Sequence, residues 1–551
     1  MTPRALVRIL WLRAKALWPW IAAASSGVLL GLCYPGWNEG SWLSWIALTP
    51  LLCALWFSGD AGKFAWLKNA GLGFCAGVVF FCITFSWLTT VTSMMSPQFL
   101  GALGWFGLMS YLALYFALWG WFTGCVAFRA KRDTQRLLSS RHNLALGALC
   151  GAAWVAQEWL RGWVFSGFGW NDLGVAMHGL VVMIQVTDIT GVAGLSFLIT
   201  MANVIAVVTV RRFMLEAQNG KLRPHFDFTL TVALVLLVFA YGVLKLQVKT
   251  PGAIPLRVAA VQGNIPEAEK FDAAYEQMIF DRYTELTETA VRSQPQLVIW
   301  PEACTPRGMY ADEANYKFVT GMAGKIDTNF LLGTLDFDDQ YDYNVAAMIP
   351  KGSSTAHDIQ LHRKIHLVPF GEYIPLRHTF PLFAKLAGDL VPGDFHPGTD
   401  YNVLQTHNPD VKIGTLICFE DTLGDLTRRF TLNHAQLLVN ITNDAWFLKS
   451  IAAEQHLANA VFRTVENRLP MVRCANTGVT CFIDSRGQVT SALRSPKGST
   501  FFAGFLNGEV QVPPGDAPTF YARYGDWFSY GALLVTFVAS VAHFALRRRR
   551  A

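Results

Sequence analysis

Charged residues are scarce in this chain. Only 15% of its 551 residues are Asp, Glu, Lys or Arg, whereas 52% are hydrophobic. Soluble globular proteins carry about 25% charged residues, so the composition excludes an entirely soluble protein. The scarcity is uneven along the chain. We predict a transmembrane bundle over residues 1–249, an exported α/β domain over residues 250–525, and a final membrane helix with a basic tail over residues 526–551.

Metal-binding patterns are also lacking. The ten cysteines form no CxxC pair, and no segment is rich in histidine, so we expect neither a metal site nor a cofactor. Six cysteines lie in or beside apolar runs and are interpreted as small apolar residues. In the exported domain, an oxidising compartment would permit pairing. The sequence leaves both Cys304–Cys481 and Cys474–Cys481 open.

Eight apolar segments are candidates to cross a bilayer, whose core needs about 20 apolar residues per helix. The first follows several basic residues, as a signal peptide does. We nevertheless expect it to be retained, because seven more segments follow and Trp18-Pro19-Trp20 suits an interfacial anchor. The eight segments are residues 16–33, 41–57, 70–89, 100–128, 144–161, 187–209, 228–247 and 526–546.

Lys and Arg are absent from alternate loops, namely those near residues 35–40, 90–99 and 165–185. They cluster instead at the N-terminus, in the loops near residues 63–68, 129–141 and 211–223, and at Arg547–Arg550. Cytoplasmic loops carry this excess of positive charge, so we expect both termini in the cytoplasm. The domain at 250–525 then lies outside the inner membrane, in the periplasm of a bacterium with two membranes.

The net charge of +6 has two interpretations. Basic clusters are typical of nucleic-acid-binding proteins, but they also orient membrane helices and meet anionic lipid headgroups. The alternation between loops already accounts for the charge. We therefore expect a membrane protein that does not bind nucleic acid.

The exported domain alternates predicted strands and helices. Apolar strands are expected at residues 256–261, 297–300, 330–334, 344–349, 411–417, 437–443, 471–475 and 480–483, with helices near 271–292, 311–325 and 452–468. This order predicts a layered α/β sandwich. Glu302 and Cys418 follow strand ends, where open α/β sheets place their ligands.

Three motifs of this domain contain the parts of a covalent acyl-transfer site. Trp300-Pro301-Glu302 offers a carboxylate, Arg363–Glu372 offers the amine of Lys364, and Leu416–Asp421 offers the thiol of Cys418. A thiol with a pKa near 8.5 needs a base, for which Glu302 is the candidate. Attack on an ester builds an oxyanion, which Lys364 would stabilise. Alone, each residue has an ordinary structural explanation.

These motifs resemble those of the carbon–nitrogen hydrolase, or nitrilase, superfamily. The resemblance implies a Glu-Lys-Cys triad in this order along the chain, on a nitrilase-like αββα sandwich. The membrane segments narrow it further. Eight spans with the domain between the seventh and eighth, together with Phe370–Pro375 and Asn443–Phe447, are similar to the apolipoprotein N-acyltransferase family. The similarity covers nearly the whole chain.

Membership of that family would imply a two-step, ping-pong reaction. Glu302 deprotonates Cys418, and the thiolate takes an acyl chain from a phospholipid, typically phosphatidylethanolamine. The α-amine of the N-terminal S-diacylglyceryl cysteine of an apolipoprotein then attacks the thioester, which gives a triacylated lipoprotein. We expect a monomer, although no residue pattern determines the oligomeric state.

Further site residues follow from the same resemblance. Glu372 would orient Lys364 or support the base, and Glu420 would help to bind the amine; a structural salt bridge is the alternative for each. The remaining candidates would line the site wall: Tyr343, Asn344 and Trp446.

Two membrane residues are also candidates. Glu158 and Arg161 share a helix face, either as an internal ion pair or as a site for a lipid headgroup or for support of the catalytic domain. The stretch Phe165–Trp170 after them resembles a GFPW motif of the family, with Gly169 where proline is usual.

The segment Tyr373–Phe395 is unusually apolar for a soluble domain and is interrupted by three prolines. It is too short and broken to cross a membrane. One interpretation is a buried connecting loop. We prefer a mobile arm that dips toward the bilayer and covers the site.

Two other functions remain open from the sequence. The same triad with water as acceptor would make a membrane-tethered amidase or nitrilase that hydrolyses a small amide. A receptor or transporter with a catalytically dead domain is the non-enzyme alternative. The seven preceding spans and the apolar arm disfavour the first, and the intact triad disfavours the second.

Overall fold

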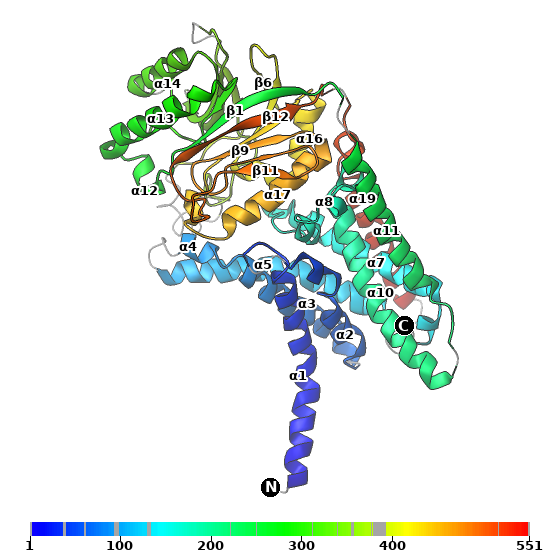
Figure 1. The fold of residues 1–551 in the computed structure, drawn as a ribbon. Coiled ribbons are helices and arrows are strands. Elements are labelled where there is room, and N and C mark those ends of the chain that lie inside the picture. Colours follow the sequence, from blue (N-terminus) through cyan, green and yellow to red (C-terminus); the bar gives the residue numbers. More distant parts are fainter. Residues whose placement is uncertain are drawn as a thin grey trace. The chain divides into compact units, whose positions relative to one another are not determined.

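The computed structural model describes residues 3–36, 40–59, 62–92, 98–128, 134–220, 222–248, 251–310, 312–338, 340–353, 358–375, 377, 379, 393–515 and 517–548. The chain forms two compact units. One comprises Met1–Thr89, Ala102–Leu244 and Asp526–Ala551, and the other comprises Thr90–Gly101 and Lys245–Gly525. Figure 1 draws the elements of both.

The first unit is helical. Its long helices are α1 (Pro3–Gly31), α3 (Ala65–Thr84), α5 (Gln98–Phe122), α7 (Ser140–Arg161), α10 (Val192–Asn219), α11 (Phe226–Gln247) and α19 (Trp527–Arg548). Shorter helices are α2 (Thr49–Phe57), α8 (Val181–Ile184) and α9 (Thr187–Thr190), while α4 (Leu88–Thr92) continues past Thr89 into the second unit. Many large apolar side chains of α5, α11 and α19 are exposed, as expected for helices that face lipid.

Within the described residues, five helices are long and apolar enough to cross a membrane: Gly62–Thr84, Gly101–Ala127, Val192–Asn219, Phe226–Gln247 and Trp527–Leu546. This finding supports a multi-pass membrane protein but does not confirm the count of eight. The predicted span 41–57 is a 3-10 turn, Ser41–Trp45, followed by α2. At 1.5 Å per residue, the nine residues of α2 reach only about 14 Å. Helix α7 includes Glu158 and Arg161, which make it less apolar.

The second unit contains two six-stranded mixed sheets. The first sheet has the order β12-β1-β2-β3-β4-β5 and the second has the order β11-β10-β9-β8-β7-β6. In each, three parallel strands stand beside antiparallel neighbours. The strands are β1 (Ile254–Gln262), β2 (Leu297–Ile299), β3 (Asn329–Phe337), β4 (Asp342–Ile349), β5 (Gln360–Arg363), β6 (Val403–Gln405), β7 (Lys412–Ile417), β8 (Leu437–Thr442), β9 (Met471–Ala475), β10 (Cys481–Ile483), β11 (Val489–Ala492) and β12 (Gly504–Val512).

The sheets pack face to face and helices cover their outer faces. Because side chains alternate along a strand, Val258 and Ala260 of β1 enter the core shared with the second sheet, while Ala259 and Val261 meet the outer helices. Figure 1 shows α13 (Glu276–Ala290) and α14 (Glu313–Ile326) on one side and α16 (Gly424–Leu432) and α17 (Ala452–Asn467) on the other. The predicted αββα sandwich is therefore confirmed.

Both faces of the central strands are buried, which explains their nearly continuous apolar sequences. This burial also explains why the central strands could be predicted from the sequence. The strands β5, β6, β11 and β12 were not predicted. The longest of them, β12, pairs with β1 across about 240 residues of chain and contains Asn507, Gly508 and Glu509, so its composition gives no strand signal.

Neither cysteine pairing left open by the sequence is formed. All ten cysteines lie in the described residues, and all are free thiols. Most of the arm predicted at Tyr373–Phe395 lies outside the described residues. Among the described residues of this segment, Arg377 near its start forms an ion pair with Asp394 near its end, at 2.7 Å.

His362 of β5 predicts a dependence of stability on pH. It is fully buried beside Phe430, and this burial lowers the pKa of His362 from 6.5 to about 4. The unfolded chain then binds a proton that the folded chain does not, so stability falls as the pH drops from 6.5 toward 4, by about 3 kcal/mol. The substitution His362→Phe should flatten this part of the curve of unfolding temperature against pH. An unchanged slope would contradict the assignment, and equal stability of both proteins at pH 8 is the control.

Candidate active site

Glu302 lies two residues beyond Trp300, where the chain leaves β2, and it is only 6% exposed. The backbone there is tightly packed against β3, since a Cβ atom added to Gly333 would lie 2.6 Å from the Cα atom of Glu302. The buried Lys270 donates from Nζ to the Glu302 carbonyl at 3.1 Å. These contacts fix the stretch of backbone from which the Glu302 carboxylate extends.

Lys364 directly follows β5 and is 1% exposed. Its backbone N–H donates to the carbonyl of Asn344 on the neighbouring strand β4, at 2.8 Å. Its Nζ lies 3.4 Å from Oε1 of Glu302 and 2.8 Å from Oε2 of Glu372. One ammonium therefore joins two carboxylates.

Asn344 completes this arrangement. Its Nδ2 donates to Oε1 of Glu302 at 2.8 Å and to Oε1 of Glu372 at 2.9 Å. The second oxygen of Glu372 accepts from the backbone N–H of Val368 at 2.8 Å. Lys364 and Asn344 thus hold Glu302 and Glu372 in fixed directions, and the structure brings together four of the residues predicted from the sequence.

The charges of this cluster keep Lys364 protonated. Burial alone would lower the pKa of Lys364, but the carboxylates of Glu372 and Glu302 outweigh it and raise that pKa above its usual value. A permanent ammonium in a shielded pocket is suited to stabilising an oxyanion.

Cys418 follows β7 and begins a short 3-10 helix, η10 (Cys418–Thr422). Its φ is +54°, in the left-handed region that L-residues seldom occupy, which is typical of strained functional positions. Burial and the charge of Glu302 raise the pKa of Cys418, and Lys364 acts in the opposite direction. The group therefore rests as a thiol and needs a base during reaction.

Glu420 is fully buried and holds two motifs together. Its Oε1 accepts from the backbone N–H groups of Ile365 and His366 at 2.7 and 3.0 Å, and its Oε2 accepts from that of Ile417 at 2.8 Å. Burial raises the pKa of Glu420 to about 7 against the effect of these donors. With no exposed surface, Glu420 is placed to position the site rather than to bind a substrate amine.

Tyr343 and Trp446 lie differently from the charged cluster. Because β4 alternates its faces, Tyr343 points away from Asn344, and its ring stacks under the guanidinium of Arg363 at 3.6 Å. Trp446 is half-buried in the turn η11 (Asp444–Phe447) that follows β8. Within the described residues, neither side chain contacts Glu302 or Lys364. No contact therefore favours the predicted site-wall role for either residue.

Glu158 and Arg161 belong to the helical unit. Arg161 forms its ion pair with Asp172, at 2.6 Å, rather than with Glu158, and also donates to the carbonyl of Trp170 at 2.7 Å. Glu158 accepts from Trp154 Nε1 and from the backbone N–H of Leu173, both at 2.7 Å. Of the two alternatives left open, the ion pair between Glu158 and Arg161 is not formed, because the loop after α7 folds back and supplies Asp172. The alternative role, in headgroup binding or support of the catalytic domain, stays a prediction.

Two residues near the site were missed by the sequence analysis. Lys270 gave no signal because a lysine on a short helix is usually solvated, and Asn440 of β8 lay within an apolar strand. Asn440 donates from Nδ2 to the carbonyl of Cys418 at 3.0 Å. Within the described residues, no group of three or more His, Cys, Asp or Glu side chains is arranged to hold a metal ion.

Comparison with known proteins matches both units. The family model for carbon-nitrogen hydrolase matches residues 257–504, and that for the apolipoprotein N-acyltransferase N-terminal domain matches residues 26–205. The former range contains Glu302, Lys364 and Cys418.

Relatives match along nearly the whole chain. An apolipoprotein N-acyltransferase of Geobacter metallireducens is 36% identical over 543 residues, which is 96% of this chain and 96% of the relative. Those of Methylococcus capsulatus and Thermotoga maritima are 30% and 28% identical, over 96% and 93% of this chain and 97% and 92% of the relatives. With both domains matched and the alignment running through the membrane helices and the buried carboxylate–lysine cluster alike, the chain belongs to the apolipoprotein N-acyltransferase family.

Proposed function

We propose that this protein transfers an acyl chain from a phospholipid, through a thioester on Cys418, to the α-amine of the N-terminal S-diacylglyceryl cysteine of apolipoproteins. The observation that carries the proposal is the pairing of buried Lys364 with Glu302 and Glu372 at 3.4 and 2.8 Å. The charges of Lys364 and Glu302 also act on the pKa of the Cys418 thiol. Membership of the family and the apolar helices support lipid and lipoprotein as substrates.

In the first half-reaction, the Glu302 carboxylate takes the proton of the Cys418 thiol as sulfur attacks the ester carbonyl. The oxyanion that forms lies by the ammonium of Lys364. When the carbon–oxygen bond breaks, Glu302 returns the proton to the departing glycerol oxygen. The products are an acyl thioester and a lysophospholipid.

In the second half-reaction, the α-amine of the lipoprotein attacks the thioester. Glu302 accepts a proton from the attacking nitrogen, the carbon–sulfur bond breaks, and the proton passes to the Cys418 sulfur. Lys364 again stabilises the oxyanion. Glu372 and Asn344 keep Lys364 and Glu302 aligned in both steps, and Glu420 keeps the lysine motif against the cysteine strand.

The location proposed for these steps is the outer face of the bacterial inner membrane. Eight segments would cross it, with both termini in the cytoplasm, the periplasmic domain at residues 250–525 and the last helix at 526–551. The alternating basic loops support this orientation. We propose phosphatidylethanolamine as donor and a monomer as the active form.

The test supplies purified protein in detergent with phosphatidylethanolamine and a synthetic diacylglyceryl lipopeptide. Mass spectrometry should detect the N-acylated lipopeptide and lysophospholipid in equal amounts. Release of free fatty acid with no acylated lipopeptide would reject the transferase and favour a hydrolase with the same triad. A lipopeptide with an acetylated N-terminus is the matched control and should not react.

A further inference from the structure

A charged side chain lies in the middle of the buried strand β9. Arg473 is flanked by Val472 and Cys474, which enter the core between the two sheets. Its own side chain points to the opposite face and is fully buried. A buried arginine is costly to desolvate, and apolar residues often stabilise a fold equally well, so its presence calls for a more specific role.

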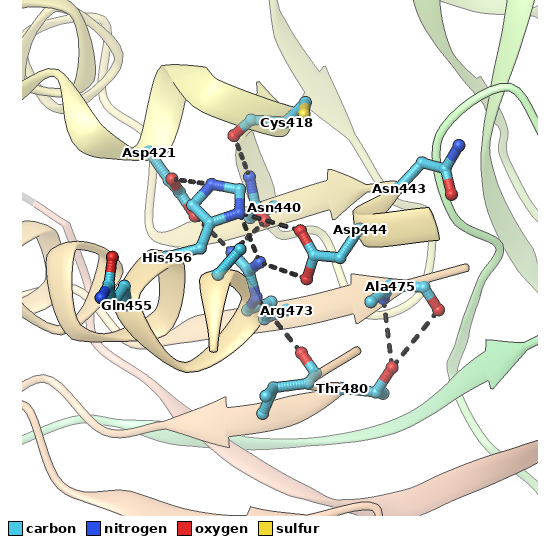
Figure 2. Close-up of polar contacts among 12 residues, drawn as sticks. Cys418, Asp421, Asn440, Asn443, Asp444, Gln455, His456, Arg473, Ala475 and Thr480 are labelled. Atoms are coloured by element: carbon cyan, nitrogen blue, oxygen red, sulfur yellow. Dashed lines mark hydrogen bonds and ion pairs between the residues drawn. The ribbon is translucent and has the colours of Figure 1, made fainter. Parts of the chain in front are cut away.

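Arg473 contacts four side chains, as Figure 2 shows. Nη1 donates to Asp421 at 2.6 Å and to Oδ1 of Asn440 at 2.9 Å. Nη2 lies 3.1 Å from Asp444 and 2.8 Å from Nδ1 of His456. Nε donates to the carbonyl of Val479 at 3.2 Å, so all three guanidinium nitrogens are engaged.

His456 of α17 lies between the two acids of this cluster. Its Nε2 is 2.7 Å from Asp421 and its Nδ1 is 3.1 Å from Asp444. Burial and Arg473 lower the pKa of His456, but the two carboxylates outweigh them and raise it overall. The cluster thus sets Arg473 and His456 against the two buried carboxylates of Asp421 and Asp444.

The cluster holds both ends of the turn that carries Cys418. Asn440 accepts from Arg473 with its oxygen, which directs its Nδ2 toward the carbonyls of Cys418 and Leu416 at 3.0 and 3.3 Å. Asp421 lies three residues after Cys418, in the same short helix η10. Figure 2 shows Cys418 directly beside Asn440. Arg473 is thus linked to Cys418 through two residues: Asn440, which donates to the Cys418 carbonyl, and Asp421, which lies in the same short helix.

We infer that Arg473 is a positioning residue of the acyl-transfer reaction: through Asn440 and Asp421 it holds Cys418 in its left-handed conformation, with sulfur aligned to Glu302 and Lys364. The inference rests on the proposed role of Cys418 as nucleophile. A thiol displaced by about 1 Å can lose on the order of 10²-fold in rate. A displaced sulfur lowers the rate of attack, so kcat should fall while KM changes little.

Two variants test the inference. Arg473→Lys keeps the charge but loses the planar fork that joins Asn440 to Asp444. Asn440→Asp keeps an oxygen for Arg473, removes the donor to the carbonyls of Cys418 and Leu416, and adds one buried carboxyl group beside the guanidinium, so it reports on position even where Arg473→Lys fails to fold. Both should lower kcat by about 10²-fold with KM within about twofold of the parent. Both should also slow the alkylation of Cys418 by iodoacetamide, measured per folded molecule by peptide mass spectrometry.

The control is Arg212→Lys in the helical unit, where Arg212 is buried against Glu216 and Asp227 at 2.8 and 3.1 Å. It should lower thermal stability while the alkylation rate of Cys418 stays at the parent value. The inference is overturned if Asn440→Asp shows parental kcat and parental alkylation. A parent protein that is alkylated rapidly but makes no acylated lipopeptide would instead reject the proposed function.

Discussion

The substitution Cys418→Ala is expected to lower N-acylation of the lipopeptide by at least about 10⁴-fold, the largest effect of any single change. The other thiols of this unit, Cys304, Cys474 and Cys481, are buried in the core, whereas Cys418 is the thiol on which the charges of Glu302 and Lys364 act. The variant should remain folded, because the side chain is half-buried and packs only at the edge of the core. Initial rates with saturating phospholipid and lipopeptide provide the measurement.

Cys150→Ala is the matched control for this loss. Cys150 is a fully buried thiol of α7 in the helical unit. Its removal should leave the rate within about twofold of the parent. Residual turnover of Cys418→Ala above about 1% would show that the acyl chain reaches the amine without passing through this sulfur.

The substitution Lys364→Met is expected to lower kcat by about 10³-fold. Removing one oxyanion donor typically costs 10²–10³ in kcat, or about 2.7–4 kcal/mol. A second loss adds to it here. Without the ammonium, the buried carboxylates of Glu302 and Glu372 face each other across Asn344, and two like charges so close cannot both stay ionised. A protonated Glu302 could no longer act as the base.

The two causes separate with pH. If a shared proton disables Glu302, the activity of Lys364→Met relative to the parent at the same pH should recover in part as the pH is raised, whereas the loss of the oxyanion donor persists at every pH. Lys351→Met is the control, because Lys351 forms only an exposed pair with Asp327 at 3.7 Å. A value of kcat for Lys364→Met within tenfold of the parent would remove Lys364 from the mechanism.

The sequence contained enough to locate the charged cluster. Glu302 and Cys418 each follow an apolar strand, and open α/β sheets place their ligands beyond the carboxyl ends of such strands. Lys364 was located by its motif alone, because the short strand β5 before it carries no apolar pattern. Glu372 could be predicted as well, because it lies in the same motif as Lys364, eight residues further along the chain. The membrane unit was predictable in kind for a similar reason, since long apolar runs have few alternatives to spanning a bilayer.

The supporting contacts could not be predicted in the same way. Arg473 lies in the strand Met471–Ala475, where the pattern indicated only a buried strand, and its four side-chain partners come from four other elements. Asp172 became the partner of Arg161 because of a loop whose path no periodicity encodes. For Glu420 the sequence left both amine binding and a structural salt bridge open, and its oxygens instead accept from backbone N–H groups that only the folded chain brings together.

The account depends on an acyl chain carried by Cys418, and this can be measured directly. Purified protein would be incubated with phosphatidylethanolamine that carries a deuterated acyl chain, without lipopeptide, and analysed by intact and peptide mass spectrometry. We predict one labelled chain on the Cys418 peptide, released by hydroxylamine and transferred to the lipopeptide when it is added. A protein that forms labelled N-acyl lipopeptide but never holds the label on Cys418 would contradict the account.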